Sequence, residues 1–383
     1  MASKRHAQIV GWGKYVPRQV LTNDDLAKMV DTSDDWIRAR TGIVERRIAE
    51  PGETTSTMSI KAAQAALQVA DVAPERLDLI IVTTITPDYL FPATACLVQD
   101  ALGARRAGAF DLLAGCSGFV YGLGVGSQLI ISGAYENVLV IGAETLSRIM
   151  DWTDRNTCVL FGDGAGALLL QASDAPGGVL SFTLGADGSG GDLLILPGGG
   201  SRHPASAETV AQKLHYARMN GREVFRFATR IMGRAAKEAI RAARLKIDDI
   251  DLFIPHQANM RIIQSAAKQL KLPMDKVFVN LDRYGNTSCA SIPIAVCEAI
   301  EEERIKPGDH LVLVSFGAGL TWAAAVVQWH VPLPAPRLPW WKRLLRRVGY
   351  RWAWLVSGLR RTYRKFNSWW GRAVGRIRGQ NNG

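Results

Sequence analysis

The chain has no long hydrophobic run and no paired cysteine motif. No stretch of about 18 consecutive apolar residues occurs in its 383 residues, so no helix is expected to span a membrane. The N-terminus, Met-Ala-Ser-Lys-Arg-His, lacks the apolar run of a secretory signal. A cytoplasmic protein in a reducing compartment is therefore expected, without a metal site. The five cysteines are scattered, with no Cys-x-x-Cys pair and no zinc-site spacing: Cys96, Cys116, Cys158, Cys289 and Cys297.

Acidic residues are absent from the C-terminal segment. Residues 332–383 hold 13 of the 46 Lys and Arg residues, which leaves 33 basic against 35 acidic residues in the rest of the chain. Hydrophobic residues make up 48% of the sequence and charged residues 21%, which is typical of a globular protein. The net charge of +11 therefore describes a nearly neutral body with a strongly basic tail.

The body contains an internal repeat at a fixed offset of 173 residues. Leu77-Asp-Leu-Ile-Ile81 matches Ile250-Asp-Leu-Phe-Ile254, and Val138-Leu-Val-Ile141 matches Leu311-Val-Leu-Val314. A third match, at the same offset, joins the segments that begin at Lys61 and Arg234. Each copy alternates helices with apolar strands, which predicts α/β layers with mostly parallel strands. We predict two duplicated halves, residues 1–172 and 173–331, and a tail of residues 332–383.

Cys116 has the surroundings of a nucleophile. It follows a strand-like segment and precedes a predicted helix over Ser117–Tyr135. A helix N-terminus favours the reactive thiolate form of such a thiol. The alternative is a buried structural cysteine, which is the commoner role of a free thiol.

Two further candidates follow strands of the second half. His256, in Pro255-His-Gln-Ala-Asn259, comes directly after a predicted strand, where α/β folds place their sites. Asn286 lies in Tyr284-Gly-Asn-Thr-Ser288, where it could form a turn or donate a hydrogen bond to an oxyanion. The turn after Phe316 could also present backbone N–H groups, whereas the glycine-rich turn Phe161–Ala167 lacks the Lys of a P-loop.

These motifs together resemble the thiolase-fold condensing enzymes, and most closely β-ketoacyl-acyl-carrier-protein synthase III. The resemblance covers residues 5–330 and implies two pseudo-equivalent α/β halves in an α-β-α-β-α arrangement. Five motifs occur in the order found in the family: Asp35-Trp-Ile-Arg-Ala-Arg-Thr-Gly-Ile43, Gly115-Cys-Ser-Gly-Phe119, Gly162-Asp-Gly-Ala-Gly166, Pro255-His-Gln-Ala-Asn259 and Gly285-Asn-Thr-Ser288.

The resemblance implies a decarboxylative Claisen condensation that initiates fatty acid synthesis. Cys116 would take the acyl group from acyl-coenzyme A. His256 and Asn286 would hold the thioester oxygen of malonyl-acyl-carrier protein as carbon dioxide leaves. The backbone N–H groups of Cys116 and Ala318 would form the oxyanion hole. No cofactor is implied, because coenzyme A thioester and carrier protein are substrates.

The resemblance also assigns binding residues and partners. It implies a homodimer, in which Phe91 would reach the acyl pocket of the partner, and docking of acyl carrier protein at Arg226, Arg261 and Lys268. Residues matching the family's coenzyme A site are Trp36, Arg40, Arg155, Gly221, Phe225, Ala258 and Asn259. Two departures, Gly115 and Ala318, lie at positions where relatives often carry Ala and Gly, so the starter chain length is left open.

Two alternative functions remain open at this point. A related condensing or acyl-transfer enzyme could act on longer acyl thioesters in a specialised pathway. A non-catalytic acyl-binding scaffold is a second alternative, which the intact set of Cys116, His256 and Asn286 disfavours.

The tail has the pattern of a basic amphipathic helix. After a proline-rich linker, large apolar residues recur with a mean step of 3.6 between Trp341 and Ile377, and six of the eleven Trp residues lie here. This pattern is typical of a segment that lies on an anionic membrane surface, so residues 340–378 predict peripheral binding at the inner membrane face. The alternatives are a mobile basic tail and a segment that docks acidic carrier protein or nucleic acid, although no nucleic-acid partner is expected. Four glycines, Gly349, Gly358, Gly371 and Gly375, predict a helix formed on binding or in pieces.

Overall fold

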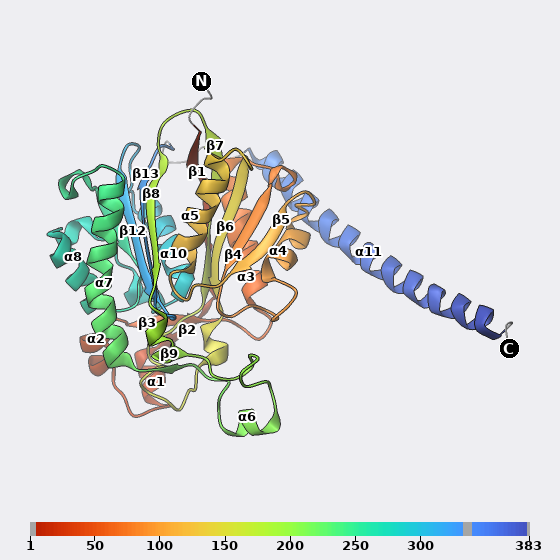
Figure 1. Ribbon diagram of the computed structural model, residues 1–383, viewed down its shortest axis with the longest axis horizontal. Helices are drawn as coiled ribbons and strands as arrows, with labels where there is room; N and C mark the ends of the chain where they lie inside the picture. The colour runs from red at the N-terminus through yellow and green to blue at the C-terminus, as the bar shows by residue number, and fades with distance from the viewer. Residues whose placement is uncertain (1–4, 332–338, 381–383) are drawn as a thin grey trace.

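The computed structural model describes residues 5–331 and 339–380, without the side chains of Trp354, Trp369 and residues 371–380. The predicted proline-rich linker therefore lies almost wholly outside the described residues. Two large sheets form the centre of the body, and a long C-terminal helix extends from one side of it (Figure 1). None of the helices in the described ranges combines the length and hydropathy of a membrane span.

The first sheet has five strands in the order β1-β7-β6-β4-β5. Strands β4 and β6 are buried along their whole length, because helices cover both faces of the sheet. Its strands are β1 (His6–Tyr15), β4 (Leu79–Thr83), β5 (Gly108–Leu112), β6 (Asn137–Glu144) and β7 (Gly164–Ser173).

The second sheet repeats this order with four strands, β11-β12-β13-β8. Its strands are β8 (Gly178–Ala186), β11 (Leu252–Pro255), β12 (His310–Gly317) and β13 (Thr321–Gln328). Strand β12 has the bounds of β6 displaced by the offset of the repeat, as the sequence predicts. The change from one sheet to the other falls between β7 and β8.

The prediction of mostly parallel strands is wrong. In the two large sheets, as far as the chain is described, β4–β5, β4–β6 and β11–β12 are parallel, whereas β1–β7, β6–β7, β12–β13 and β8–β13 are antiparallel. Only residues 318–320 separate β12 from β13, and a connection this short joins antiparallel neighbours.

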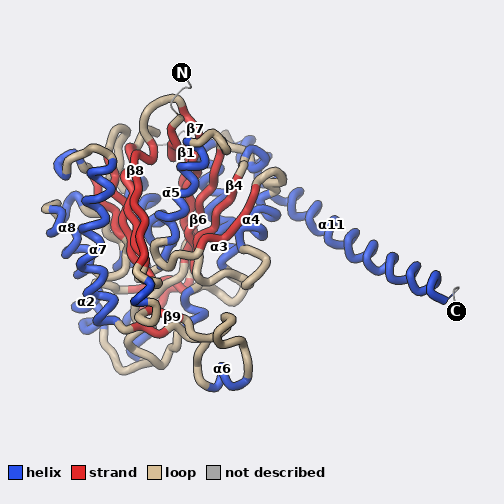
Figure 2. The backbone as a smooth tube through the Cα atoms, in the orientation of Figure 1, coloured by secondary structure: helices blue, strands red, loops and turns tan. Residues whose placement is uncertain are grey.

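Five layers follow from the side chains that each face buries, as the thiolase-like fold implies. Helices α3 (Thr55–Ala70) and α4 (Thr94–Leu102) pack on the outer face of the first sheet. Helices α7 (Gly221–Ala242) and α8 (Met260–Leu270) pack on the outer face of the second sheet. Between the sheets lie α5 (Gly118–Ile131) and α10 (Ser291–Glu301), which share one apolar core with the inner faces of both (Figure 2).

Smaller elements surround one end of these layers. The β2–β3 ribbon and helices α1 and α2 lie near the lower end in Figure 1. The remaining bounds are β2 (Gln19–Thr22), α1 (Asn23–Ala27), α2 (Asp34–Thr41), β3 (Glu45–Ile48), β9 (Leu194–Ile195), α6 (Ala207–Ala211), β10 (Arg218–Met219) and α9 (Leu281–Tyr284).

The tail forms one continuous helix, α11 (Trp340–Gln380). The helical prediction is confirmed, whereas the expected division into pieces is not found. Figure 1 shows the outer part of α11 projecting beyond the body.

A buried carboxylate ties the two halves together. Glu298 on α10 is 3% exposed and lies 2.7 Å from Lys14 Nζ on β1. It also accepts hydrogen bonds from Asn280 Nδ2 at 3.0 Å and from the Tyr284 hydroxyl. Burial opposes the charged form, but the hydrogen bonds from Lys14, Tyr284 and Asn280 outweigh it and hold the pKa of Glu298 below its usual value. The carboxylate is therefore charged at neutral pH.

Replacing Glu298 by Gln should destabilise the protein by about 2–4 kcal/mol, because it leaves Lys14 without its buried partner. Glu301→Gln is a matched control, since Glu301 pairs with the same amine at 2.7 Å but its side chain is 59% exposed; its cost should stay below about 0.5 kcal/mol. Urea unfolding measures both. Because the pKa of Glu298 is lowered, its contribution is present above its unfolded pKa and is lost as the pH falls. Equal costs for the two variants would contradict this account.

Candidate active site

A cavity of about 970 Å³ brings together the three residues that the sequence singled out. Cys116, His256 and Asn286 all line it, although they lie on three separate segments. Cys116 comes from the first half and the other two from the second. All three residues are buried, so the cavity holds polar groups that are largely removed from water.

Cys116 lies in the turn between β5 and α5, against the turn that follows β12. Gly115 has a φ of +56°, and a Cβ there would lie 2.6 Å from Ala318 N. A Cβ on Gly317 would lie 2.4 Å from Cys116 N. The two backbones are therefore in contact, and both glycines are required by it. This brings the N–H groups of Cys116 and Ala318 into the same region, although Ala318 does not line the cavity.

The protonation state of Cys116 differs from the sequence-based expectation. Burial raises the pKa of the Cys116 thiol to about 12, and the Ser288 side chain lowers it only in part. Removal of the thiolate from water is the largest influence on this pKa. The thiol is therefore protonated at neutral pH.

His256 follows β11 and is neutral. Burial lowers the pKa of its imidazole to about 3. Nδ1 lies 2.7 Å from the Ser291 hydroxyl, which accepts a hydrogen bond from Gln257 N at 3.4 Å. The hydroxyl proton is then available to Nδ1, which places the imidazole proton on Nε2. Nε2 is buried without a hydrogen-bond partner among the described residues, so it can donate to a ligand in the cavity.

Asn286 is held by backbone hydrogen bonds on both sides. Its N–H donates to Leu160 O at 2.8 Å, and its carbonyl accepts from Gly162 N at 3.0 Å. The glycine-rich turn at Phe161 thus supports this loop. Asn286 Oδ1 accepts from Ser288 N at 2.8 Å, which leaves the amide nitrogen as a donor.

Aromatic and basic side chains form the opening of the cavity. The Trp36 ring on α2 has two guanidinium groups close to it, that of Arg40 at 4.7 Å from the ring centroid and that of Arg155 at 4.6 Å. The Arg261 guanidinium lies 5.2 Å from the centroid of the Phe225 ring. Six of the seven residues predicted to bind coenzyme A line the cavity, namely Trp36, Arg40, Gly221, Phe225, Ala258 and Asn259; Arg155 does not.

Comparison with known proteins identifies the family. Residues 110–188 match the model of 3-oxoacyl-[acyl-carrier-protein] synthase III, and residues 240–329 match its C-terminal model. A β-ketoacyl-[acyl-carrier-protein] synthase III of Roseiflexus sp. (strain RS-1) is 56% identical over 324 residues, 85% of this chain and 98% of the relative. The protein of that name from Desulfitobacterium hafniense (strain Y51) is 59% identical over 321 residues, covering 84% and 97%.

The chain belongs to the β-ketoacyl-[acyl-carrier-protein] synthase III family. Solved structures agree with this assignment. The synthase III of Aquifex aeolicus VF5 is 49% identical with a TM-score of 0.78, over 84% of this chain and 100% of the other. That of Thermus thermophilus is 51% identical with a TM-score of 0.79, over 84% and 99%. Each of these relatives is matched over 97–100% of its own length, whereas 84–85% of this chain is matched.

Besides Ala318, four predicted site residues lie outside the cavity of the single chain. Phe91 is 85% exposed, beside Tyr89 and Leu90, which are 60% and 83% exposed. Arg226 on α7 pairs with Glu223 at 3.1 Å and its side chain is 70% exposed. Lys268, near the C-terminal end of α8, and Arg155 also do not line it. Arg261, in contrast, does.

Sequence reasoning missed the residues that surround the three central ones. Ser291, which fixes the imidazole, is the first residue of α10, but a serine at a helix start carries no signal of that role. Cys289 is the counterpart of Cys116 in the second copy of the repeat, yet its thiol donates to Thr83 O at 2.8 Å and lies 3.0 Å from Glu144 Oε1. Burial and the Glu144 carboxyl group raise the pKa of the Cys289 thiol well above its usual value. Unlike Cys116, Cys289 does not line the cavity.

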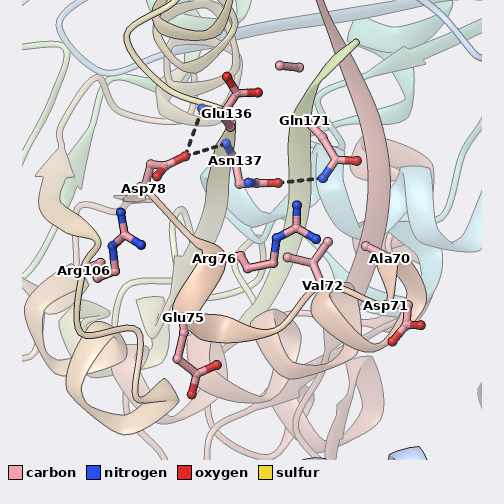
Figure 3. Close-up of a pocket in the computed structure, with 11 residues that line it drawn as sticks. Ala70, Asp71, Val72, Glu75, Arg76, Asp78, Arg106, Glu136, Asn137 and Gln171 are labelled. Atoms are coloured by element: carbon pink, nitrogen blue, oxygen red, sulfur yellow. Dashed lines mark hydrogen bonds between the residues drawn. The ribbon is translucent and has the colours of Figure 1, made fainter.

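A second cavity, of about 600 Å³, lies beside the C-terminal end of α3. Figure 3 shows Asp78 bound to the backbone N–H groups of Glu136 and Asn137, and the side chain of Gln171 bound to that of Asn137. These polar groups are engaged with one another, and the cavity contains none of the predicted site residues.

The raised pKa of Cys116 predicts a distinctive pH profile of alkylation. The rate of iodoacetamide reaction at Cys116 should rise about tenfold per pH unit from pH 7 to 10, because the thiolate fraction grows throughout this range. Peptide mass spectrometry separates this reaction from that of the exposed Cys96. A rate that is already constant near pH 7 would indicate a thiolate–imidazolium pair and contradict this picture.

Proposed function

We propose that this synthase III condenses an acyl group from acyl-coenzyme A with malonyl-acyl-carrier protein, which initiates fatty acid synthesis. The observation that carries this proposal is the cavity in which one thiol and two hydrogen-bond donors converge. No cofactor is required, because the substrates supply the thioester and the carboxylate.

In the first step, Cys116 Sγ attacks the acyl carbon and the coenzyme A sulfur leaves. The thiol proton ends on the departing thiol, so the transfer needs no net acid or base. The N–H groups of Cys116 and Ala318 would stabilise the tetrahedral oxyanion.

In the second step, the malonyl thioester loses carbon dioxide. The electron pair of the broken bond forms an enolate, whose oxygen would accept from His256 Nε2 and Asn286 Nδ2. The enolate carbon attacks the acyl carbon of the acyl-cysteine, and the sulfur of Cys116 leaves as a thiolate. This thiolate takes a proton from water, which restores the thiol. The product is a β-ketoacyl-acyl-carrier protein. A neutral imidazole is suited to this role, since it donates without needing to titrate.

Single substitutions should divide the two steps. Cys116→Ala should abolish acyl-enzyme formation, whereas His256→Ala and Asn286→Ala should still acylate but lose condensation by about 10²–10³-fold each. Intact-protein mass spectrometry with coenzyme A thioesters from acetyl to long chain measures the first step, and product assay the second. Cys96→Ala is the control and should retain both.

Loss of acylation in a folded His256 or Asn286 variant would contradict this division. The thioester that loads best also identifies the starter class, including the longer acyl chains of the alternative function.

We propose that Trp36, with Arg40 and Arg155, holds the adenine and phosphates of coenzyme A. A flat ring beside two guanidinium groups suits an aromatic base with attached anions. The walls formed by Gly221, Phe225, Ala258 and Asn259 would take the pantetheine arm.

Trp36→Ala should raise KM for acyl-coenzyme A about tenfold, because a stacked base contributes about 1–3 kcal/mol. KM for the same acyl group on pantetheine should stay unchanged, since that substrate has no adenine. Steady-state kinetics with both substrates measures the difference. An equal rise for both would indicate general damage to the cavity.

Carrier protein and a second copy of the chain are the proposed partners. Arg226, Arg261 and Lys268 would dock the acidic carrier, with Arg261 nearest the cavity. The exposed apolar side chains at Tyr89, Leu90 and Phe91 support a homodimer in which Phe91 reaches the partner's acyl pocket. We also propose that the halves meet at residue 173, with the nucleophile in one and the two donors in the other.

For the tail, we propose that residues 340–378 bind an anionic membrane surface and hold the enzyme at the inner membrane face. The basic composition and the outward apolar side chains of α11 support this role.

A further inference from the structure

The inner half of α11 packs on the body through one face. Its residues recur every three or four positions and contact α3, α4 or the turns after them. They are Lys342, Arg346, Tyr350, Ala353, Ser357 and Arg361. We call this set the docked face. No sequence pattern predicts it, because its members share neither charge nor hydropathy.

The first contact is at the C-terminal end of α3. Asp71, the C-cap of that helix, pairs with Lys342 at 2.6 Å and with Arg346 at 2.7 Å. Arg346 also donates to Leu67 O, and its side chain is only 14% exposed. A guanidinium that satisfies a helix-terminal carbonyl and a carboxylate together fixes position better than an exposed ion pair.

Close packing continues along the helix. Tyr350 packs against the core between α3, α4 and the first sheet, and burial raises the pKa of its hydroxyl to about 12. A Cβ on Gly103, at the end of α4, would lie 2.9 Å from Ala353 Cβ. The backbone of α11 thus approaches α4 as closely as small residues allow.

The last contact is an ion pair on α4. Asp100 Oδ2 accepts from the Ser357 hydroxyl at 2.5 Å and from Arg361 Nη2 at 3.1 Å. Ser357 is 6% exposed, although it lies on a helix that is otherwise mostly exposed. Two carboxylates, Asp71 and Asp100, therefore hold α11 at both ends of the docked face.

The large apolar side chains of α11 lie on the other side of the helix. Trp341, Leu344, Val348, Trp352, Leu355, Leu359 and Tyr363 are between 48% and 68% exposed. We call these seven residues the apolar stripe. At about 100° per residue, the stripe and the docked face lie on roughly opposite sides of the helix. The stripe therefore does not serve to attach the helix to the body.

Basic side chains border the stripe. Arg347, Arg351 and Lys365 lie along one edge on the same helical projection, and Arg360 lies along the other. None of these four forms an ion pair with any described residue. An apolar stripe bordered by cations matches the layers of an anionic bilayer, in which headgroups lie above acyl chains.

We propose that α11 is a rigid two-sided arm, which Asp71 and Asp100 clamp to the body so that the apolar stripe faces an anionic lipid bilayer. This proposal rests on the membrane role proposed above and adds that the helix is formed before binding and fixes the orientation of the enzyme. Helices α2, α7 and α8, which supply the opening of the cavity, lie on the opposite side of the body from α11 in Figure 1. When α11 is bound to a bilayer, the opening of the cavity therefore lies on the side of the body away from α11.

Hydrogen exchange of the full chain without lipid tests the clamp. Amides of residues 342–361 should be protected more than those of 364–370, at least tenfold. In the double variant Asp71→Asn and Asp100→Asn, this difference should disappear while condensation activity stays unchanged. Unprotected amides in the unsubstituted chain would overturn the clamp.

Flotation on vesicles tests the lipid face. The full chain should float with vesicles of equal parts phosphatidylcholine and phosphatidylglycerol, and far less with phosphatidylcholine alone or at high salt. Trp352→Asn with Leu355→Asn should lower partition at least tenfold. Met29→Asn with Val210→Asn is the matched control, because these body residues are 50% and 64% exposed.

The hydrogen-exchange and flotation experiments test separate parts of the proposal, and each can contradict its own part. Protected amides with no flotation would overturn the lipid assignment and leave the docked helix. Flotation without protection would overturn the rigid arm and leave the membrane role. A change of oligomeric state in the stripe variant, measured by light scattering, would assign the stripe to a second copy of the chain and overturn the lipid face. Catalytic failure would show separately in the product assay.

Discussion

The burial of two helices between two sheets is the constraint on which the active site depends. Helices α5 and α10 pack against the inner faces of both sheets, so neither can shift without disturbing the whole core. Each begins close to a residue that lines the cavity: α5 starts two residues after Cys116, and α10 starts at Ser291, which lies within hydrogen-bond distance of His256. The groups that line the cavity are thus positioned by the layer between the sheets rather than by loops alone. The buried Glu298 on α10 joins the same layer to β1.

The motifs and their order are sufficient to predict the family and the duplicated fold. Cys116, His256 and Asn286 can be found because each follows a recognisable strand or turn, and the internal repeat predicts where the strands of the second sheet lie. The predicted strand direction is wrong, because direction depends on connection length, which an offset between repeats does not reveal. The protonation of Cys116 also requires the structure, since desolvation is a property of the closed cavity and not of the neighbouring sequence.

For the tail, the sequence predicts the helix but not its contacts with the body. Its period of 3.6 predicts a helix and an apolar face, but nothing in the period indicates which face the body uses. Arg346 and Tyr350 dock because Asp71 and the α3–α4 core are near them in space, and those partners lie in the first third of the chain. Contacts between residues so far apart in the sequence cannot be predicted from the sequence of the tail alone. A mixed polar and aromatic face is also invisible to a hydropathy pattern.

The repeat has a consequence for how reactivity arises. The two halves carry a cysteine at equivalent places, Cys116 and Cys289, each just before a helix of the middle layer. One opens on a cavity, and the other lies against the Glu144 carboxyl group and a backbone carbonyl. The same functional group therefore has different surroundings at equivalent places: Cys116 lines the cavity, whereas the thiol of Cys289 is engaged in hydrogen bonds. The duplication thus places two thiols at equivalent positions, and the surroundings of Cys116, unlike those of Cys289, suit the nucleophile proposed above.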